Sequence, residues 1–220
     1  MVAAAPGSRA LSGDVVANPA DRSILCYEGS YSKIFTATVK LLRKGTVSAM
    51  PFDPRAVANR LLDLARERQL IIDPMKVQKL IYYAHGWHLA LTGKPLLDRS
   101  VEAWQYGPVL PDVYRAFQEF GAQPITEPAR YAAVDGNKLV LRRYKLPAGD
   151  PDVEYTDRIL RRVLEQYGNY SAIELSMMTH AAGTPWAHAW SENPGKRYIP
   201  IADDEIAAYF KSVLKPVAAA

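Results

Sequence analysis

The chain has 220 residues, of which 49% are hydrophobic and 23% charged, and these proportions exclude an intrinsically disordered protein. No run of about 18 apolar residues occurs, so no helix is expected to span a membrane. The single cysteine, Cys26, excludes a disulfide framework or a thiolate-rich metal site and fits a cytoplasmic location. Residues 50–220 contribute only +1 to the net charge of +4, which gives no reason to expect nucleic acid as a partner.

Residues 1–49 differ from the rest of the chain in composition and charge. They contain six basic and three acidic residues, and their first 20 positions are rich in Ala, Gly, Ser and Pro without the apolar stretch of a secretory signal. Two interpretations are open: a flexible basic tail, or an extension that results from choosing too early a start codon. Met50 directly precedes a helix start, which favours the second. We therefore expect one folded domain over residues 50–220.

Two Asp-Pro pairs predict the first two helices, because the aspartate caps a helix whose first position suits proline. The first helix begins at Pro54. Its apolar residues have the spacing of one buried face: Val57, Leu61, Leu64 and Ala65. The second helix begins at Pro74 and runs to about Leu91, before a glycine and a proline end it. A third helix is expected over residues 111–121.

Residues 129–145 predict a small β-hairpin. Its tight turn is expected at Asp135-Gly136-Asn137, and it ends in the basic residues Arg142, Arg143 and Lys145. Residues 146–154 contain two prolines and a glycine, which indicate a loop.

Three further helices are expected in the C-terminal half. One runs from near Thr156 to Gly168, and a second opens with a Ser171–Glu174 capping box and continues through Met178. The second is apolar on most sides, so we expect it to be central. The last begins at Asp203. The predicted fold is therefore mainly α within the α+β class: a compact helical domain with one small β-hairpin.

The four histidines form two pairs in the sequence, His85 with His88 and His180 with His188. A His-x-x-His spacing on a helix can bind a metal ion. On a helical wheel, however, His88 lies near the centre of an apolar stripe and His85 at its edge. Neutral core histidines are the better interpretation, with no metal and no cofactor. No Gly-x-Ser-x-Gly nucleophile motif occurs either, so we expect a protein that is not an enzyme.

Aromatic residues suggest a protein-binding surface. On the second helix Tyr83 and Trp87 flank the apolar stripe, while Lys79, Tyr82 and Gly86 face the opposite way. A glycine inside a helix permits the close approach of another backbone, and tyrosine and tryptophan are frequent anchors of interfaces. The predicted partner-binding residues are Lys79, Tyr82, Tyr83, Gly86, Trp87 and Tyr106. Trp104 and Trp186 are expected in the core.

Three separated segments resemble one protein family. Residues 75–86 (MKVQKLIYYAHG), 102–109 (EAWQYGPV) and 175–186 (LSMMTH, then PW) resemble motifs of the SocA-like antitoxins, or Panacea domain. The resemblance extends over residues 54 to about 215 and departs at His85, where glutamine is usual. The motif residues expected to have structural roles are Gln78, Trp104, Gly107, Pro108, His180, Pro185 and Trp186.

The resemblance implies an antitoxin that binds a cognate protein toxin, without catalysis of its own. In the founding branch of the family, it implies an adaptor that presents the toxin to the ClpXP protease through ClpX. Three alternatives remain open: simple sequestration of the toxin, a histidine-based metal hydrolase, and a nucleic-acid-binding autoregulator. The autoregulator would use the basic end of the hairpin and Arg158, Arg161 and Arg162, although arginines at that spacing more often form a solvated helix face.

Overall fold

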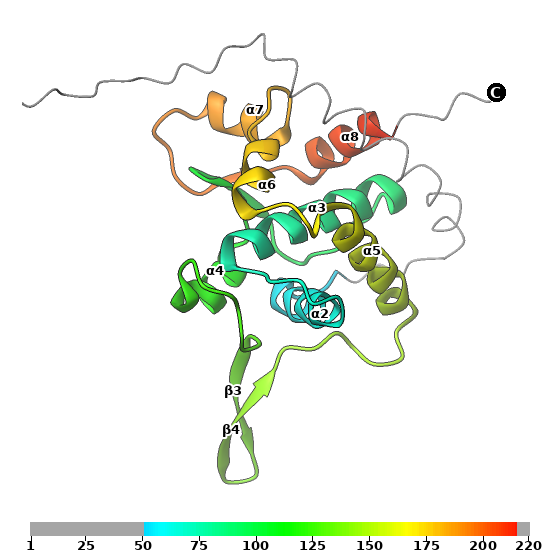
Figure 1. Ribbon diagram of the computed structural model, residues 1–220, viewed down its shortest axis with the longest axis vertical. Coiled ribbons are helices and arrows are strands. Elements are labelled where there is room, and N and C mark those ends of the chain that lie inside the picture. The colour runs from blue at the N-terminus through cyan, green and yellow to red at the C-terminus, as the bar shows by residue number, and fades with distance from the viewer. Residues whose placement is uncertain (1–50, 215–220) are drawn as a thin grey trace, which may run out of the picture.

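The computed structural model describes residues 51–214, so the predictions for residues 1–49 lie outside the described residues. Within that range the fold is mainly α, as predicted, with seven α-helices, a short 3₁₀ helix and two small antiparallel sheets (Figure 1). No helix in this range is long and apolar enough to span a membrane. The elements in chain order are α2 (Pro54–Glu67), α3 (Pro74–Thr92), β1 (Val101–Trp104), β2 (Gly107–Val109), α4 (Pro111–Phe117), η1 (Gln118–Phe120), β3 (Arg130–Asp135), β4 (Lys138–Arg143), α5 (Pro151–Tyr167), α6 (Ala172–Thr179), α7 (Pro185–Glu192), β5 (Ile199–Ile201) and α8 (Asp203–Val213).

Helix α3 forms the centre of the molecule (Figure 1). Every residue from Lys76 to Leu89 is buried, because α2, α5, α6 and α8 all pack against this helix. Its ends follow the sequence prediction: the Asp73 side chain accepts from the Lys76 N–H, and Gly93 ends the helix in the left-handed conformation. A helix buried on all sides has no solvent-facing stripe, which matters for the residues discussed below.

Helix α5 begins earlier than predicted. The structure starts it at Pro151, with the Asp150 side chain accepting from the Asp152 N–H, so the predicted loop over residues 146–154 is wrong at its C-terminal end. Asp150-Pro151 is the same start signal as the two Asp-Pro pairs before α2 and α3. Its neighbours Pro147 and Gly149 obscured that signal in the sequence.

Helix α6 opens with the predicted capping box but is less central than expected. Ser171 and Glu174 satisfy each other's backbone N–H groups. Leu175, on the inner side, is buried, whereas Ile173 and Met177 are exposed. The prediction of a central helix was therefore wrong, because only one side of this short helix packs on α3 and β2.

A three-stranded sheet and helix α7 were absent from the sequence prediction. Strand β1 pairs on one side with β2 and on the other with β5, which lies about 100 residues further along the chain. Each strand is only three or four residues long, so no alternating pattern marks it in the sequence. Helix α7 begins at Pro185, capped by the Thr184 hydroxyl.

The β3–β4 hairpin forms where predicted and projects from the helical body (Figure 1). Its strands pair from Arg130 with Arg143 to Asp135 with Lys138. Asn59 of α2 anchors its base: the Asn59 Nδ2 donates to the Ala129 and Tyr144 carbonyls, both at 2.9 Å, and Oδ1 accepts from the Ala129 N–H at 2.8 Å. The hairpin is thus fixed at one end.

Candidate partner-binding surface

The first two sequence motifs meet where α3 packs against β2. The Gln78 side chain donates to the Leu110 carbonyl at 3.2 Å and accepts from the Leu110 N–H at 2.8 Å. The next residue, Lys79, donates through its Nζ to the Pro108 carbonyl at 3.1 Å. Two polar side chains of a buried helix therefore satisfy backbone groups of β2 and of Leu110, the residue that follows it.

Gly107 is required at this contact by conformation and by space. Its φ of 101° lies in a region that side chains other than hydrogen disfavour. A Cβ atom there would lie 2.7 Å from the Lys79 Nζ and 2.8 Å from the Thr179 Oγ1. The Ser176 hydroxyl also donates to the Tyr106 carbonyl at 2.9 Å. The β1–β2 turn is therefore clamped between α3 and α6.

The third motif covers the same turn from the other side. The Trp186 Nε1 donates to the Trp104 carbonyl at 2.8 Å, and its ring stacks on His180 with a centroid separation of 3.8 Å. The Thr184 hydroxyl, one position before Pro185, donates to the Thr179 carbonyl at 2.7 Å. The motif residues predicted to be structural thus converge on one junction, although they lie up to about 100 residues apart.

This motif junction is a poor environment for positive charge. Burial lowers the pKa of the Lys79 ammonium to about 7. Burial, and then the positive charge of Lys79, lower the pKa of His180. Among the described residues the buried His180 Nε2 has no hydrogen-bond partner. Burial thus shifts both groups from their ordinary pKa values towards the neutral form.

Five of the six predicted partner-binding residues are buried. Tyr82, Tyr83 and Trp87 fill the core between α3, α5 and α8, and Lys79 belongs to the motif junction. Gly86 does permit a close approach, but of Phe210 from α8: a Cβ atom at Gly86 would lie 2.2 Å from that ring. The surface predicted around Tyr82 and Gly86 is therefore not exposed, because α8 covers the side of α3 that the helical wheel left free.

Tyr106 alone of the six is exposed, at 63%, at the tip of the β1–β2 turn. Other aromatic residues surround this turn. Trp104 was expected in the core, but it is only half-buried, because Val101 and Ala103 are the inward-facing residues of β1. Its ring contacts Tyr114 of α4 and Tyr198, with centroids 5.1 Å and 5.8 Å apart. Tyr198 is 65% exposed. We call the four residues Trp104, Tyr106, Tyr114 and Tyr198 the aromatic surface. The exposed Met177 of α6 lies one residue from the Ser176 that contacts Tyr106.

A comparison with protein families matches residues 77–187 to the domain described as "Antitoxin SocA-like, Panacea domain". This chain belongs to the SocA-like antitoxin family. It is 38% identical over 135 residues to Antitoxin SocA of Caulobacter vibrioides (strain NA1000 / CB15N), a match that covers 61% of this chain and 68% of that relative. No solved structure matches the chain. The relationship supports the role of an antitoxin in a toxin–antitoxin system and suggests a non-enzymatic protein.

The SocA-like match contains the first motif from Val77 onward and both of the others, but it ends before two elements that complete the site. It runs from α3 to the start of α7. Strand β5 and helix α8 follow it, and they bring Tyr198 beside Trp104 and Phe210 onto Gly86. The position of Tyr198 depends on the pairing of β5 with β1, so no local signal in the sequence identified it.

The histidines of this SocA-like chain have separate structural partners. The buried His85 places its Nε2 2.9 Å from the Asp203 Oδ1 at the start of α8. His88 places its Nδ1 2.8 Å from the Lys94 carbonyl, and burial lowers its pKa to about 4. His188 is exposed beside Glu192. Among residues 51–214 no group of three or more His, Cys, Asp or Glu residues could hold a metal ion.

Proposed function

We propose that this chain is an antitoxin that binds and neutralises a cognate protein toxin through the aromatic surface. The observation that supports this placement is an exposed tyrosine, Tyr106, at the tip of a turn whose backbone is held by Lys79, Ser176 and Trp186. A rigid aromatic side chain loses little conformational freedom on binding, and a few such anchors supply most of the energy of an interface.

The finer mechanism that we propose is that of a proteolytic adaptor in the cytoplasm. The chain would hold its toxin and present it to ClpX of the ClpXP protease, as the family resemblance implies for the founding branch. Support for this step comes from the similarity to Antitoxin SocA. Simple sequestration of the toxin is the competing mechanism.

The autoregulator alternative has less structural support. Its arginine row on α5 is occupied by ion pairs: Arg158 with Glu154, Arg161 with Glu67, and Arg162 with Glu165. Paired arginines on an exposed helix face are available to phosphates only after those pairs break. The geometry therefore favours a protein partner over nucleic acid.

Co-expression with the protein encoded by the adjacent gene tests the function and the mechanism together. A stable complex in a pull-down supports the antitoxin proposal, and a shortened half-life of the bound protein in a pulse-chase supports the adaptor mechanism. Binding with an unchanged half-life leaves sequestration. The absence of any complex would contradict the proposal for this pair of proteins.

The variant Tyr106→Ala tests where the toxin binds. We expect the dissociation constant to rise at least about tenfold, since a hot-spot residue contributes about 2 kcal/mol or more. The free energy of unfolding should change by less than about 0.5 kcal/mol, because the side chain is exposed. Ile71→Ala removes another exposed apolar side chain, in the α2–α3 connection, and should leave affinity unchanged. Equal affinities for both variants would place the toxin elsewhere.

A further inference from the structure

The β3–β4 hairpin exposes apolar side chains that no described element covers. Val134, Leu139 and Leu141 are 75%, 76% and 69% exposed. Val134 lies opposite Leu139, and Ala132 lies opposite Leu141, so these four residues share one face of the hairpin. Isolated residues of this kind are common on protein surfaces, whereas a continuous apolar face on a projecting element indicates a contact site.

The backbone N–H and C=O groups of these residues point away from the hairpin, along the two free edges of its two-stranded sheet. The Tyr144 N–H donates to the Ala129 carbonyl. Hydrogen-bonded pairs alternate with non-hydrogen-bonded pairs along an antiparallel ladder, so the hydrogen-bonded pairs within the hairpin are Tyr131–Arg142, Ala133–Val140 and Asp135–Lys138. The backbone groups of Leu139 and Leu141 therefore point outward from β4. The sheet contains only β3 and β4, so within residues 51–214 no strand pairs with this edge.

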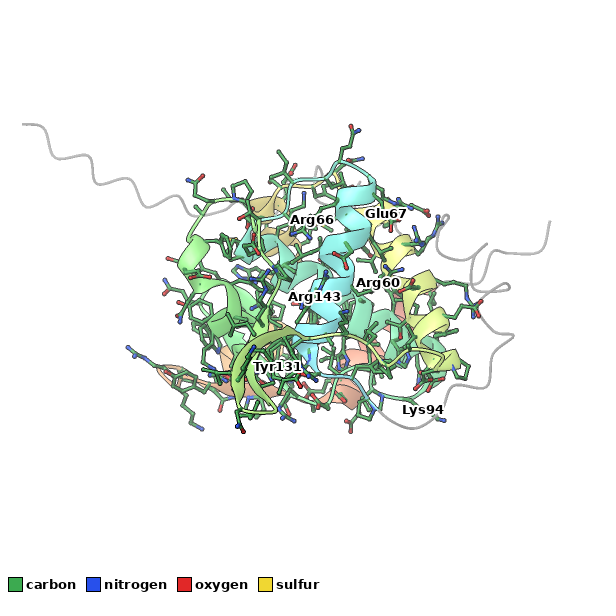
Figure 2. All side chains as sticks on the ribbon, turned by 90° about the horizontal axis from the view of Figure 1, so that it is seen from below. Arg60, Arg66, Glu67, Lys94, Tyr131 and Arg143 are labelled. Carbon is green, nitrogen blue, oxygen red and sulfur yellow. The ribbon has the colours of Figure 1, made fainter. Side chains whose placement is uncertain are left out.

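An open groove continues from the β4 edge along the body. It has a volume of about 890 Å³ and is lined by α2, by Arg143 at the end of β4, by residues 144–150 and by the start of α5, but by no residue of β3. Arg143, labelled in Figure 2, is one of the lining residues, and its side chain donates to the Asn59 carbonyl and to Asp63 of α2. An extended segment beside β4 would therefore meet the groove at the base of the hairpin.

The hairpin also differs in charge from the rest of the described chain. Residues 129–145 contain five basic residues and one acidic residue, a net charge of +4, whereas the other described residues contain 15 basic and 19 acidic residues, a net charge of −4. Arg130, Arg142 and Arg143 pair with acidic groups of this chain. Lys138 and Lys145 form no ion pair within residues 51–214. Lys138 directly precedes Leu139, on the other face of the strand, and Lys145 lies two residues beyond the end of β4.

We propose that the β4 edge binds an extended apolar segment with acidic flanks, which adds to the hairpin as a third strand. The backbone groups of Leu139 and Leu141 would supply the hydrogen bonds, and the apolar face and the two lysines would select the side chains. This inference rests on the proposed function, because the partner that presents the segment is the toxin. It adds a second contact, separate from the aromatic surface.

Other occupants of this edge fit the observations less well. Pairing of β4 with a second copy would bring together two hairpins that each carry +4, and that charge opposes self-association. Nucleic acid would meet three arginines already paired with acidic groups and an apolar face that phosphate does not match. An extended segment with apolar side chains and acidic flanks matches both the apolar face and the positive charge of the hairpin.

Proline substitutions at the two edges provide a matched test. Leu141→Pro removes an outward N–H from the β4 edge, and Ala132→Pro removes an outward N–H from the β3 edge, so neither removes a hydrogen bond within the hairpin. The affinity of the full chain for the toxin encoded by the adjacent gene is measured by calorimetry. We expect Leu141→Pro to weaken binding at least tenfold and Ala132→Pro less than twofold, with equal thermal unfolding temperatures.

A charge reversal supplies a second test that does not disturb the strand. Lys138→Glu should weaken binding and reduce its dependence on salt, whereas Lys211→Glu, which reverses an exposed lysine on α8, should do neither. Wild-type affinity in both Leu141→Pro and Lys138→Glu would overturn the inference while leaving the antitoxin proposal intact. A wild-type chain that fails to bind the toxin would instead refute the proposed function. A dimer in sedimentation that Leu141→Pro dissociates would overturn the inference in favour of self-association.

Discussion

Helix α3 and the β3–β4 hairpin reverse the usual relation between polarity and exposure. The buried part of α3 contains two lysines and two histidines, whereas the hairpin exposes Val134, Leu139 and Leu141. The difference arises from the number of neighbours: among the described elements five helices (α2, α4, α5, α6 and α8) and strand β2 contact α3, whereas the hairpin is anchored to the body through Asn59 at its base. Residue polarity alone would therefore place part of α3 at the surface and the apolar face of the hairpin in the core. Candidate binding surfaces have to be identified from the residues that the packing leaves exposed.

Replacing one large side chain in each region should give the largest contrast. Trp87→Ala should lower the free energy of unfolding by about 3–5 kcal/mol, because the indole packs on Phe210 and donates to the Tyr167 hydroxyl. Leu139→Ala in the hairpin should change it by less than about 0.5 kcal/mol. Urea denaturation followed by circular dichroism measures both. Similar losses in the two variants would mean that the hairpin is packed as tightly as α3.

A glycine substitution beside each region should give a smaller contrast. Gly107→Ala should cost about 2–3 kcal/mol of stability, because it adds a Cβ atom beside Lys79 and Thr179 to an unfavourable φ. Gly136→Ala, in the hairpin turn, also has a positive φ but nothing within 4 Å of its Cβ position, so about 1 kcal/mol is expected. The difference between the two measures steric crowding at the motif junction. Equal losses would show that the crowding relaxes without cost.

The pH dependence of stability should distinguish the lysines of the two regions. Lys79 has a pKa of about 7 in the folded chain instead of the ordinary 10.5, so between these values the unfolded chain binds more protons. As the pH rises above 7, the free energy of unfolding therefore increases through this group by at most about 1.4 kcal/mol per pH unit. Below pH 7 Lys79 is charged in both states, and the destabilisation from burying its charge is present in full. Lys79→Met should flatten the rise between pH 7 and 9, and Lys138→Met should leave it unchanged. Parallel profiles for wild type and Lys79→Met would contradict the burial of a neutral lysine.

The local signals in the sequence predicted helix starts well. The Asp-Pro pairs before α2 and α3 and the Ser171–Glu174 capping box act within one turn of backbone, so residue type alone suffices to locate them. The Gly136-Asn137 turn was also located, since it requires a positive φ that glycine readily adopts. The third Asp-Pro pair, before α5, carries the same signal, but it follows Pro147 and Gly149, which are typical of a loop.

The candidate site was predicted only in part, for a physical reason. Tyr106 was identified and is exposed, but Tyr82 and Trp87 were assigned to a surface that α8 covers. The helical wheel of α3 shows which residues share a face and contains no information about the number of helices that will pack against it. Tyr198 was missed because it reaches Trp104 only after β5 pairs with β1.

The sequence by itself determined the family, the mainly helical class, the helix caps and the position of the hairpin, because each depends on motifs or on contacts within a few residues. Only the tertiary structure decided which side chains remain exposed. Exposure depends on contacts between segments up to about 120 residues apart, such as Phe210 on Gly86 and Trp186 on Trp104. Those contacts bury two lysines and several aromatic residues in α3, and they leave Tyr106 and the apolar face of the hairpin exposed.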